Sequence, residues 1–152
     1  MRVVVQRVSK ASVAVSGREV GRIGPGLVVL AGIEQGDSER EMAYMADKII
    51  NLRIFPDQDG KMNLGIKETG GQILSISQFT LVSRIGKGRR PDFGNAADPR
   101  LAERLFDFFN ERLGREVPIE KGVFGAMMDV ELINSGPVTF IIERSCPGAI
   151  GE

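Results

Sequence analysis

Polar side chains with catalytic potential stand in an apolar segment near the middle of the chain. Residues 73–82 have the β-branched, alternating pattern of a buried strand, yet they include Ser77, Gln78 and Thr80. Burying such groups without hydrogen-bond partners costs about 1 to 3 kcal/mol each, so they must pair internally or face a pocket. Two interpretations stay open: the segment lines a pocket, or its hydroxyls belong to an ordinary strand.

A second feature is the dipeptide Gly136-Pro137. An X-Pro bond is the only kind with a reasonable chance of being cis, at roughly one in twenty in folded proteins, and a preceding glycine leaves space for a ligand beside the backbone. These base rates favour a trans turn between two strands. Gly24-Pro25, which lies in another turn signal, shows how little the dipeptide indicates alone.

The loop of residues 84–91 is the best local candidate for contact with an RNA backbone. It carries Arg84, Lys87, Arg89 and Arg90 and no acid, and its glycines let the backbone approach a phosphate. A solvated basic loop is the alternative, because no aromatic side chain is interleaved before Phe93. Twenty basic and twenty acidic residues cancel over the whole chain, so any nucleic-acid contact must be local.

The sequence has no histidine and one cysteine. A Ser-His-Asp triad, a Cys-His dyad and an intrachain disulfide are therefore excluded, and a zinc site would need carboxylates and the thiol of Cys146. We expect no metal and no cofactor. A length of 152 residues with 42% hydrophobic side chains predicts a single domain. The absence of a membrane-length apolar run and of a signal-peptide pattern predicts a cytoplasmic protein.

The elements that must position these residues follow from periodicity. Strands are expected at residues 3–8, 11–15, 27–33, 73–82, 130–133 and 138–142, with turns at residues 16–18 and 24–26. One helix is expected from Glu39 to Leu52, with a capping box of Ser38 and Glu41, and another after Asp98-Pro99 with Gly114 as its stop. The pattern predicts an α/β fold with a mixed, largely antiparallel, curved, barrel-like sheet and two main amphipathic helices.

Taken together, segments along nearly the whole chain resemble the D-aminoacyl-tRNA deacylase family. The matching segments are Val5-Gln6-Arg7-Val8, Ala11-Ser12-Val13, Gly26-Leu27, Arg53-Ile54-Phe55, Gly60-Lys61-Met62-Asn63, Ser77-Gln78-Phe79-Thr80-Leu81, Arg90-Pro91, Phe124-Gly125-Ala126-Met127-Met128 and Asn134-Ser135-Gly136-Pro137-Val138-Thr139. Residues 1–145 then form the deacylase domain and residues 146–152 a C-terminal tail. So many ordered matches are more specific than any one of them.

The resemblance implies an enzyme that hydrolyses the ester between a D-amino acid, or glycine, and the 3′ end of transfer RNA. It implies a homodimer whose active sites lie between the Ser-Gln-Phe-Thr segment of one subunit and the Gly-Pro element of the other. Gly136-Pro137 is then cis and acts as a gate: its main-chain carbonyls capture the amino group and leave no space for an L side chain.

The same resemblance assigns roles within the site. Main-chain N–H groups at Phe79 and Thr80 stabilise the oxyanion, and the 2′-hydroxyl of the RNA activates water, which accords with the missing histidine. Thr80 as a covalent nucleophile is less attractive, because no base is evident beside it, so we expect it to shape the pocket together with Ser77. Arg7 and Gln78 orient the terminal adenosine and the pocket wall. Phe124 and Met128 line the adenine side.

Two departures and two alternatives accompany this interpretation. Met127 stands where many relatives carry a polar residue, which alters the pocket rim, and the tail extends beyond the usual end. A sister deacylase with a trans Gly-Pro would instead clear small L-amino acids from mismatched transfer RNA. A non-catalytic RNA-binding module would use the loop of residues 84–90, with a steep salt dependence and no ester turnover.

Overall fold

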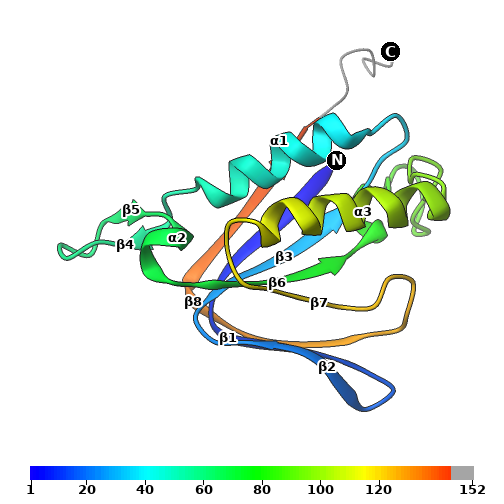
Figure 1. Cartoon of the computed structure of the whole chain (residues 1–152). Helices are drawn as coiled ribbons and strands as arrows, with labels where there is room; N and C mark the ends of the chain where they lie inside the picture. Colours follow the sequence, from blue (N-terminus) through cyan, green and yellow to red (C-terminus); the bar gives the residue numbers. More distant parts are fainter. Residues whose placement is uncertain (145–152) are drawn as a thin grey trace.

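The computed structural model describes residues 1–144, so Cys146 and the expected tail of residues 146–152 lie outside it. Figure 1 shows the elements, which are, in chain order, β1 (Arg2–Val15), β2 (Arg18–Ile23), β3 (Gly26–Gly32), α1 (Glu39–Ile50), β4 (Phe55–Pro56), β5 (Met62–Leu64), α2 (Ile66–Thr69), β6 (Gln72–Ser77), the 3-10 helix η1 (Phe79–Val82), α3 (Pro99–Gly114), β7 (Ile119–Lys121) and β8 (Asp129–Glu143). No helix within residues 1–144 is long and apolar enough to cross a membrane.

One mixed sheet contains most of the strands, in the order β2-β1-β3-β6-β7, with β8 pairing with β1 outside that path. β1 pairs antiparallel with β2, β3 and β8, whereas β6 is parallel to both β3 and β7. The sheet curves strongly, as Figure 1 shows. The expected α/β fold with a mixed, barrel-like sheet is confirmed.

The helices α1 and α3 lie next to one another over one face of the sheet (Figure 1). Ser38 and Glu41 form the expected capping box of α1, and the Asp98 carboxylate accepts the Arg100 N–H at the start of α3. The main core lies between these helices and the sheet and includes Phe106 and Phe109. A second cluster lies on the opposite face of the sheet, around Val13, Val28, Leu74 and Ile76. The sheet is thus buried on both faces where β3 and β6 run.

Three expectations about the strands were wrong. Residues 3–8 and 11–15 belong to the single strand β1, because β8 pairs with it along its length. Residues 130–133 and 138–142 likewise belong to the single strand β8, with Gly136-Pro137 inside it. Residues 73–82 do not form one strand: β6 ends at Ser77, and the chain turns into η1.

The expected turn at Gly136-Pro137 is replaced by a bulge. Gln6 pairs with Thr139 and Val8 pairs with Asn134, so residues 135–138 of β8 face Arg7 alone. The Asn134 side chain bridges the bulge, because its Oδ1 accepts the Val138 N–H at 2.7 Å and its Nδ2 donates to the Val138 carbonyl at 3.1 Å. The strand therefore resumes its ladder beyond the bulge without a change of partner.

Candidate active site

The 3-10 helix η1 sits directly on the end of β3. The Gln78 N–H donates to the Ala31 carbonyl at 2.8 Å, and the Leu81 N–H donates back to the Gln78 carbonyl at 3.2 Å. Gly32 permits this close approach, because a Cβ there would stand 2.9 Å from Val82 Cγ1 and 3.0 Å from the Gln78 carbonyl oxygen. The absence of a side chain at Gly32 thus fixes the height of η1 above the sheet.

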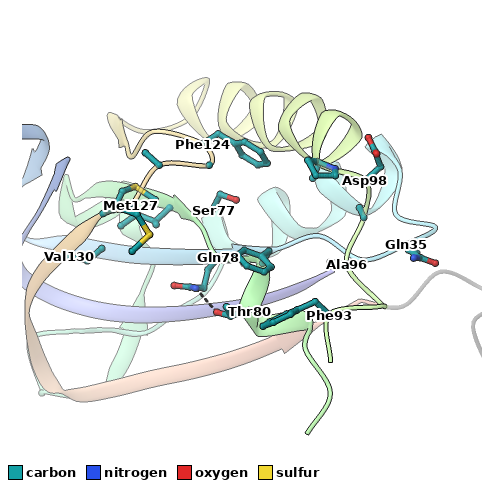
Figure 2. Close-up of a pocket in the computed structure, with 18 residues that line it drawn as sticks. Gln35, Ser77, Gln78, Thr80, Phe93, Ala96, Asp98, Phe124, Met127 and Val130 are labelled. Carbon is teal, nitrogen blue, oxygen red and sulfur yellow. Dashed lines mark hydrogen bonds between the residues drawn. The ribbon is translucent and has the colours of Figure 1, made fainter. Parts of the chain in front are cut away.

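A cavity of about 910 Å³ lies beside η1, between the start of α3 and the loop that leads into β8. Figure 2 shows its lining, which comprises Gln35, Ile76, Ser77, Gln78, Phe79, Thr80, Phe93, Ala96, Ala97, Asp98, Pro99, Ala102, Phe124, Gly125, Ala126, Met127, Met128 and Val130. The structure therefore brings together Ser77, Gln78, Phe79 and Thr80 with Phe124 and Met128, as the sequence suggested. The volume lies near the upper end of the range of ligand pockets, roughly 300–1,000 Å³.

The polar groups of the cavity are few and gather at η1. Gln78 Nε2 donates to Thr80 Oγ1 at 2.5 Å, as the dashed line in Figure 2 marks. In residues 1–144, the N–H groups of Phe79 and Thr80 have no hydrogen-bond acceptor, so both are free to bind a ligand oxygen. Among residues 1–144, the cavity lining includes no lysine or arginine, and its carboxylate, Asp98, caps α3. This arrangement can stabilise an oxyanion through main-chain donors, and it offers Thr80 no evident base.

Two aromatic side chains form opposite walls of the cavity, and only Phe124 was predicted from the sequence. Phe124 packs on the buried ring of Phe106, with ring centroids 6.2 Å apart. Phe93 packs on Phe79, with centroids 5.1 Å apart and planes inclined by 54°. In Figure 2, Phe124 and Phe93 lie on opposite sides of Ser77. The signal in the sequence that could have identified Phe93 was its position two residues after the basic loop of residues 84–91.

Further lining residues were missed because their elements were expected to serve only the fold. Gln35 lies in the loop after β3, Ala96 and Asp98 precede α3, and Val130 lies at the start of β8. Met127, which was expected at the rim, has 91% of its surface exposed. The rim of the cavity is therefore apolar where Met127 stands.

Gly136, Pro137 and Arg7 are not among the residues that line this cavity. The Gly136-Pro137 bond is cis, as the resemblance implied and contrary to the base rate. Arg7 holds the bulge from the side, since its Nε donates to the Ser135 carbonyl at 2.9 Å and its Nη1 to the Ile54 carbonyl at 2.7 Å. The residues predicted to form one site thus fall into two separate groups on a single chain.

The basic loop projects beside the cavity. Its base is closed by two hydrogen bonds between the main chains of Arg84 and Asp92, at 2.8 and 2.9 Å. The side chains of Arg84, Lys87, Arg89 and Arg90 are all exposed, and within the described part of the chain none forms a salt bridge. The cations of this loop are therefore free to bind an anion near the cavity.

β8 leaves apolar side chains exposed along its length. Val130, Ile133, Phe140 and Ile141 are 39%, 49%, 39% and 67% exposed. In the described sheet, β8 pairs with β1 on one edge only. A long edge strand with apolar side chains is normally covered by another chain or element.

The chain is similar over almost its full length to proteins of one family. The family model described as D-Tyr-tRNA(Tyr) deacylase matches residues 4–143. A Bacillus velezensis protein named D-aminoacyl-tRNA deacylase is 57% identical over 144 residues, which cover 94% of this chain and 98% of the relative. A protein of the same name from Bacillus cytotoxicus is 58% identical over 144 residues, covering 94% of this chain and 99% of the relative. Among solved structures, the c-Myc DNA Unwinding Element Binding Protein is 40% identical with a TM-score of 0.91, covering 96% of this chain and all of the other.

Proposed function

Since this chain belongs to the D-Tyr-tRNA(Tyr) deacylase family, we propose that it hydrolyses the ester between a D-amino acid, or glycine, and the 3′ end of transfer RNA. The observation that carries this proposal is the large apolar cavity with two unused main-chain donors at Phe79 and Thr80. An apolar wall suits a nucleobase, and the donors suit the oxygen of an ester. The enzyme would act in the cytoplasm on mischarged transfer RNA and so enforce homochirality.

Catalysis rests on main-chain donors and on the substrate itself. The Phe79 and Thr80 N–H groups stabilise the negative charge that develops on the ester carbonyl oxygen, and removing one such donor typically costs about 2.7 to 4 kcal/mol. The neighbouring 2′-hydroxyl of the RNA activates the attacking water. Thr80, whose hydroxyl accepts a hydrogen bond from Gln78, shapes the pocket together with Ser77. The carbonyl oxygen of the ester therefore sits at η1, with no metal or covalent intermediate required.

The terminal adenosine occupies the side of the cavity formed by Phe124 and Met128. Phe124 is held by Phe106 in the core, so its ring offers a fixed apolar surface to the base. Gln78 lines the opposite wall beside Thr80. This placement leaves the ester near the free N–H groups of η1.

The chiral gate comes from the second subunit of a homodimer. In one chain Gly136 and Pro137 do not line the cavity. The strand that carries them, β8, has exposed apolar side chains and pairs with β1 alone among the described strands. Association of two copies through β8 would bring the Gly136-Pro137 bulge of each over the cavity of the other. The main-chain carbonyls of the bulge then hold the amino group and exclude an L side chain. Arg7 orients this gate through its hydrogen bond to Ser135.

A non-catalytic nucleic-acid-binding module remains the second candidate, since the similar solved structure is named as a DNA-element-binding protein. The basic loop of residues 84–90 would serve either function by contacting phosphates. The free N–H groups at η1 favour the enzyme, because phosphate binding by the loop does not use them. The two candidates differ in whether the ester is turned over.

The test is hydrolysis of three esters by purified protein in the presence of a chelator: D-tyrosyl-tRNA, L-tyrosyl-tRNA and glycyl-tRNA. The proposal expects rapid, chelator-insensitive loss of the D and glycyl esters with the L ester intact. A small L-amino acid ester on mismatched transfer RNA is assayed beside them, and its hydrolysis would instead indicate the sister deacylase. Inertness toward all three esters, combined with salt-sensitive RNA binding, would leave the binding module.

A further inference from the structure

Phe93 and Phe79 form an exposed aromatic wall at the end of the cavity away from Phe124. Their ring centroids are 5.1 Å apart, and 40% of Phe93 and 56% of Phe79 remain exposed. Both side chains line the cavity. A hydrophobic ring that keeps so much of its surface in water, inside a ligand cavity, is a ready surface for an aromatic partner.

The same wall is joined to the basic loop. The paired main chains of Arg84 and Asp92 close the loop, and Phe93 follows Asp92 directly. The cations of the loop therefore begin where the aromatic wall ends. Within residues 1–144, these cations form no salt bridge. Proteins bind single-stranded nucleic acid with this combination: the bases stack on aromatic side chains, and cations contact the phosphates.

We propose that Phe93, supported by Phe79, is the stacking subsite for the nucleobase on the 5′ side of the terminal adenosine. This inference rests on the proposed function, which places the adenine against Phe124 and Met128 and the ester at η1. The next nucleotide then leaves the cavity past Phe93, and the phosphate between the two nucleosides meets the basic loop. The cavity, at about 910 Å³, has a volume near the upper limit for small-ligand pockets, which suits more than one nucleoside.

The experiment compares three D-tyrosyl esters as substrates: the ester of adenosine, the ester of the dinucleotide cytidylyl-adenosine, and the same dinucleotide with the cytosine base removed. The abasic compound keeps the phosphate, so it separates stacking from charge. The variants are Phe93→Ala, which removes the ring, and Phe93→Tyr, which keeps it. Ile85→Ala is the matched control, because Ile85 is 72% exposed on the same loop and does not line the cavity.

The subsite predicts that Phe93→Ala raises the KM for the dinucleotide ester about tenfold, the usual scale of one base-aromatic stack. The KM for the adenosine and abasic esters should change less than twofold. Phe93→Tyr and Ile85→Ala should match the wild-type enzyme on all three substrates. In the wild-type enzyme, removing the cytosine base from the dinucleotide ester should raise KM by the same factor as Phe93→Ala does.

Two results would overturn the subsite. An equal loss on all three esters in Phe93→Ala would mean that the ring only supports Phe79 and η1. An unchanged KM for the dinucleotide ester would mean that no base stacks there. Failure of the proposed function is distinguishable from both, since the wild-type enzyme would then hydrolyse none of the esters and the subsite would lose its premise.

Discussion

Arg7 Nε donates to the carbonyl oxygen of Ser135 at 2.9 Å, from the middle of β1 to the start of the bulge in β8. Arg7 also donates to the Ile54 carbonyl at 2.7 Å, so one guanidinium ties the bulge to a segment that precedes β4. Hydrogen bonds from a charged donor contribute about 1.5 to 3 kcal/mol each. Arg7 is therefore the side chain best placed to keep Gly136 and Pro137 in one orientation.

Replacing Arg7 should make the Gly136-Pro137 gate less rigid without unfolding the chain. Arg7→Lys keeps the charge but loses the forked pair of hydrogen-bond donors. We expect this variant to lower kcat/KM for D-tyrosyl-tRNA by about tenfold and to reduce the ratio of kcat/KM for the D ester to that for the L ester. Steady-state kinetics on both esters measure this. Arg18→Lys, at the exposed start of β2, is the control. Unchanged D/L selectivity in Arg7→Lys would count against a role for Arg7 in the gate.

Gly32 should control the position of the catalytic donors. A Cβ at Gly32 would lie 2.9 Å from Val82 and 3.1 Å from Leu81 Cβ, so Gly32→Ala must lift η1 off β3. Such overpacking costs about 1 to 3 kcal/mol, and we expect at least a tenfold fall in kcat. Gly24→Ala is the matched control, because the nearest atom to a Cβ there is Gln72 Oε1, at an ordinary contact distance of 3.9 Å. Equal kcat values in the two variants, with both proteins folded, would refute the importance of this contact.

The contrast between η1 and α3 shows what sequence reasoning can reach. The limits of α3 follow from local signals: Asp98 caps its start, Pro99 occupies the first turn, and Gly114 is its last residue. The break after Ser77 has no such signal, because β-branched and aromatic residues continue through Val82. It depends on the distant Gly32, which leaves room for η1, and on Arg2, whose Nη1 donates to the Leu81 carbonyl at 2.8 Å.

The site was likewise predictable only in part. Ser77, Gln78 and Thr80 stood out because polar groups interrupt an apolar pattern. Phe93 did not, because an aromatic residue in a loop has no periodicity to interpret. The bulge at Gly136 was missed for a physical reason. The Asn134 side chain bridges residues 135–138. Turn statistics do not include such a contact, so they predict a chain reversal at Gly136-Pro137.

A substitution at Thr80 tests whether this residue shapes the pocket or acts as a covalent nucleophile. We expect Thr80→Ser, which keeps the hydroxyl and loses the methyl group, to abolish most turnover because the pocket wall is changed. Rapid-quench kinetics followed by intact-mass measurement should detect no acylated protein during a single turnover. Thr69→Ser, the same change at an exposed threonine that does not line the cavity, is the control. An acyl group trapped on Thr80 would falsify this view and establish a covalent intermediate.

The basic loop should determine how salt affects substrate binding. Each phosphate contact to a single strand contributes about 0.7 to the slope of log K against log salt concentration. The double variant Lys87→Gln with Arg89→Gln should therefore reduce the slope for aminoacyl-tRNA while kcat at saturation stays the same. Arg18→Gln serves as the control for loss of an exposed cation. A slope equal to that of the wild-type enzyme would exclude Lys87 and Arg89 from RNA binding.

A mixed dimer separates an interface site from a site within one chain. Thr80→Ser impairs the cavity of its own chain, and Gly136→Ala impairs the gate, because a Cβ at Gly136 would stand 2.6 Å from Val138 Cγ2. If each site combines the cavity of one subunit with the gate of its partner, a heterodimer of the two variants keeps one intact site and should show about half of the wild-type activity. The two parent homodimers, purified with the same pair of affinity tags, should be nearly inactive. If cavity and gate instead belonged to the same chain, both sites of the heterodimer would be damaged, and its activity would be no higher than that of the parents.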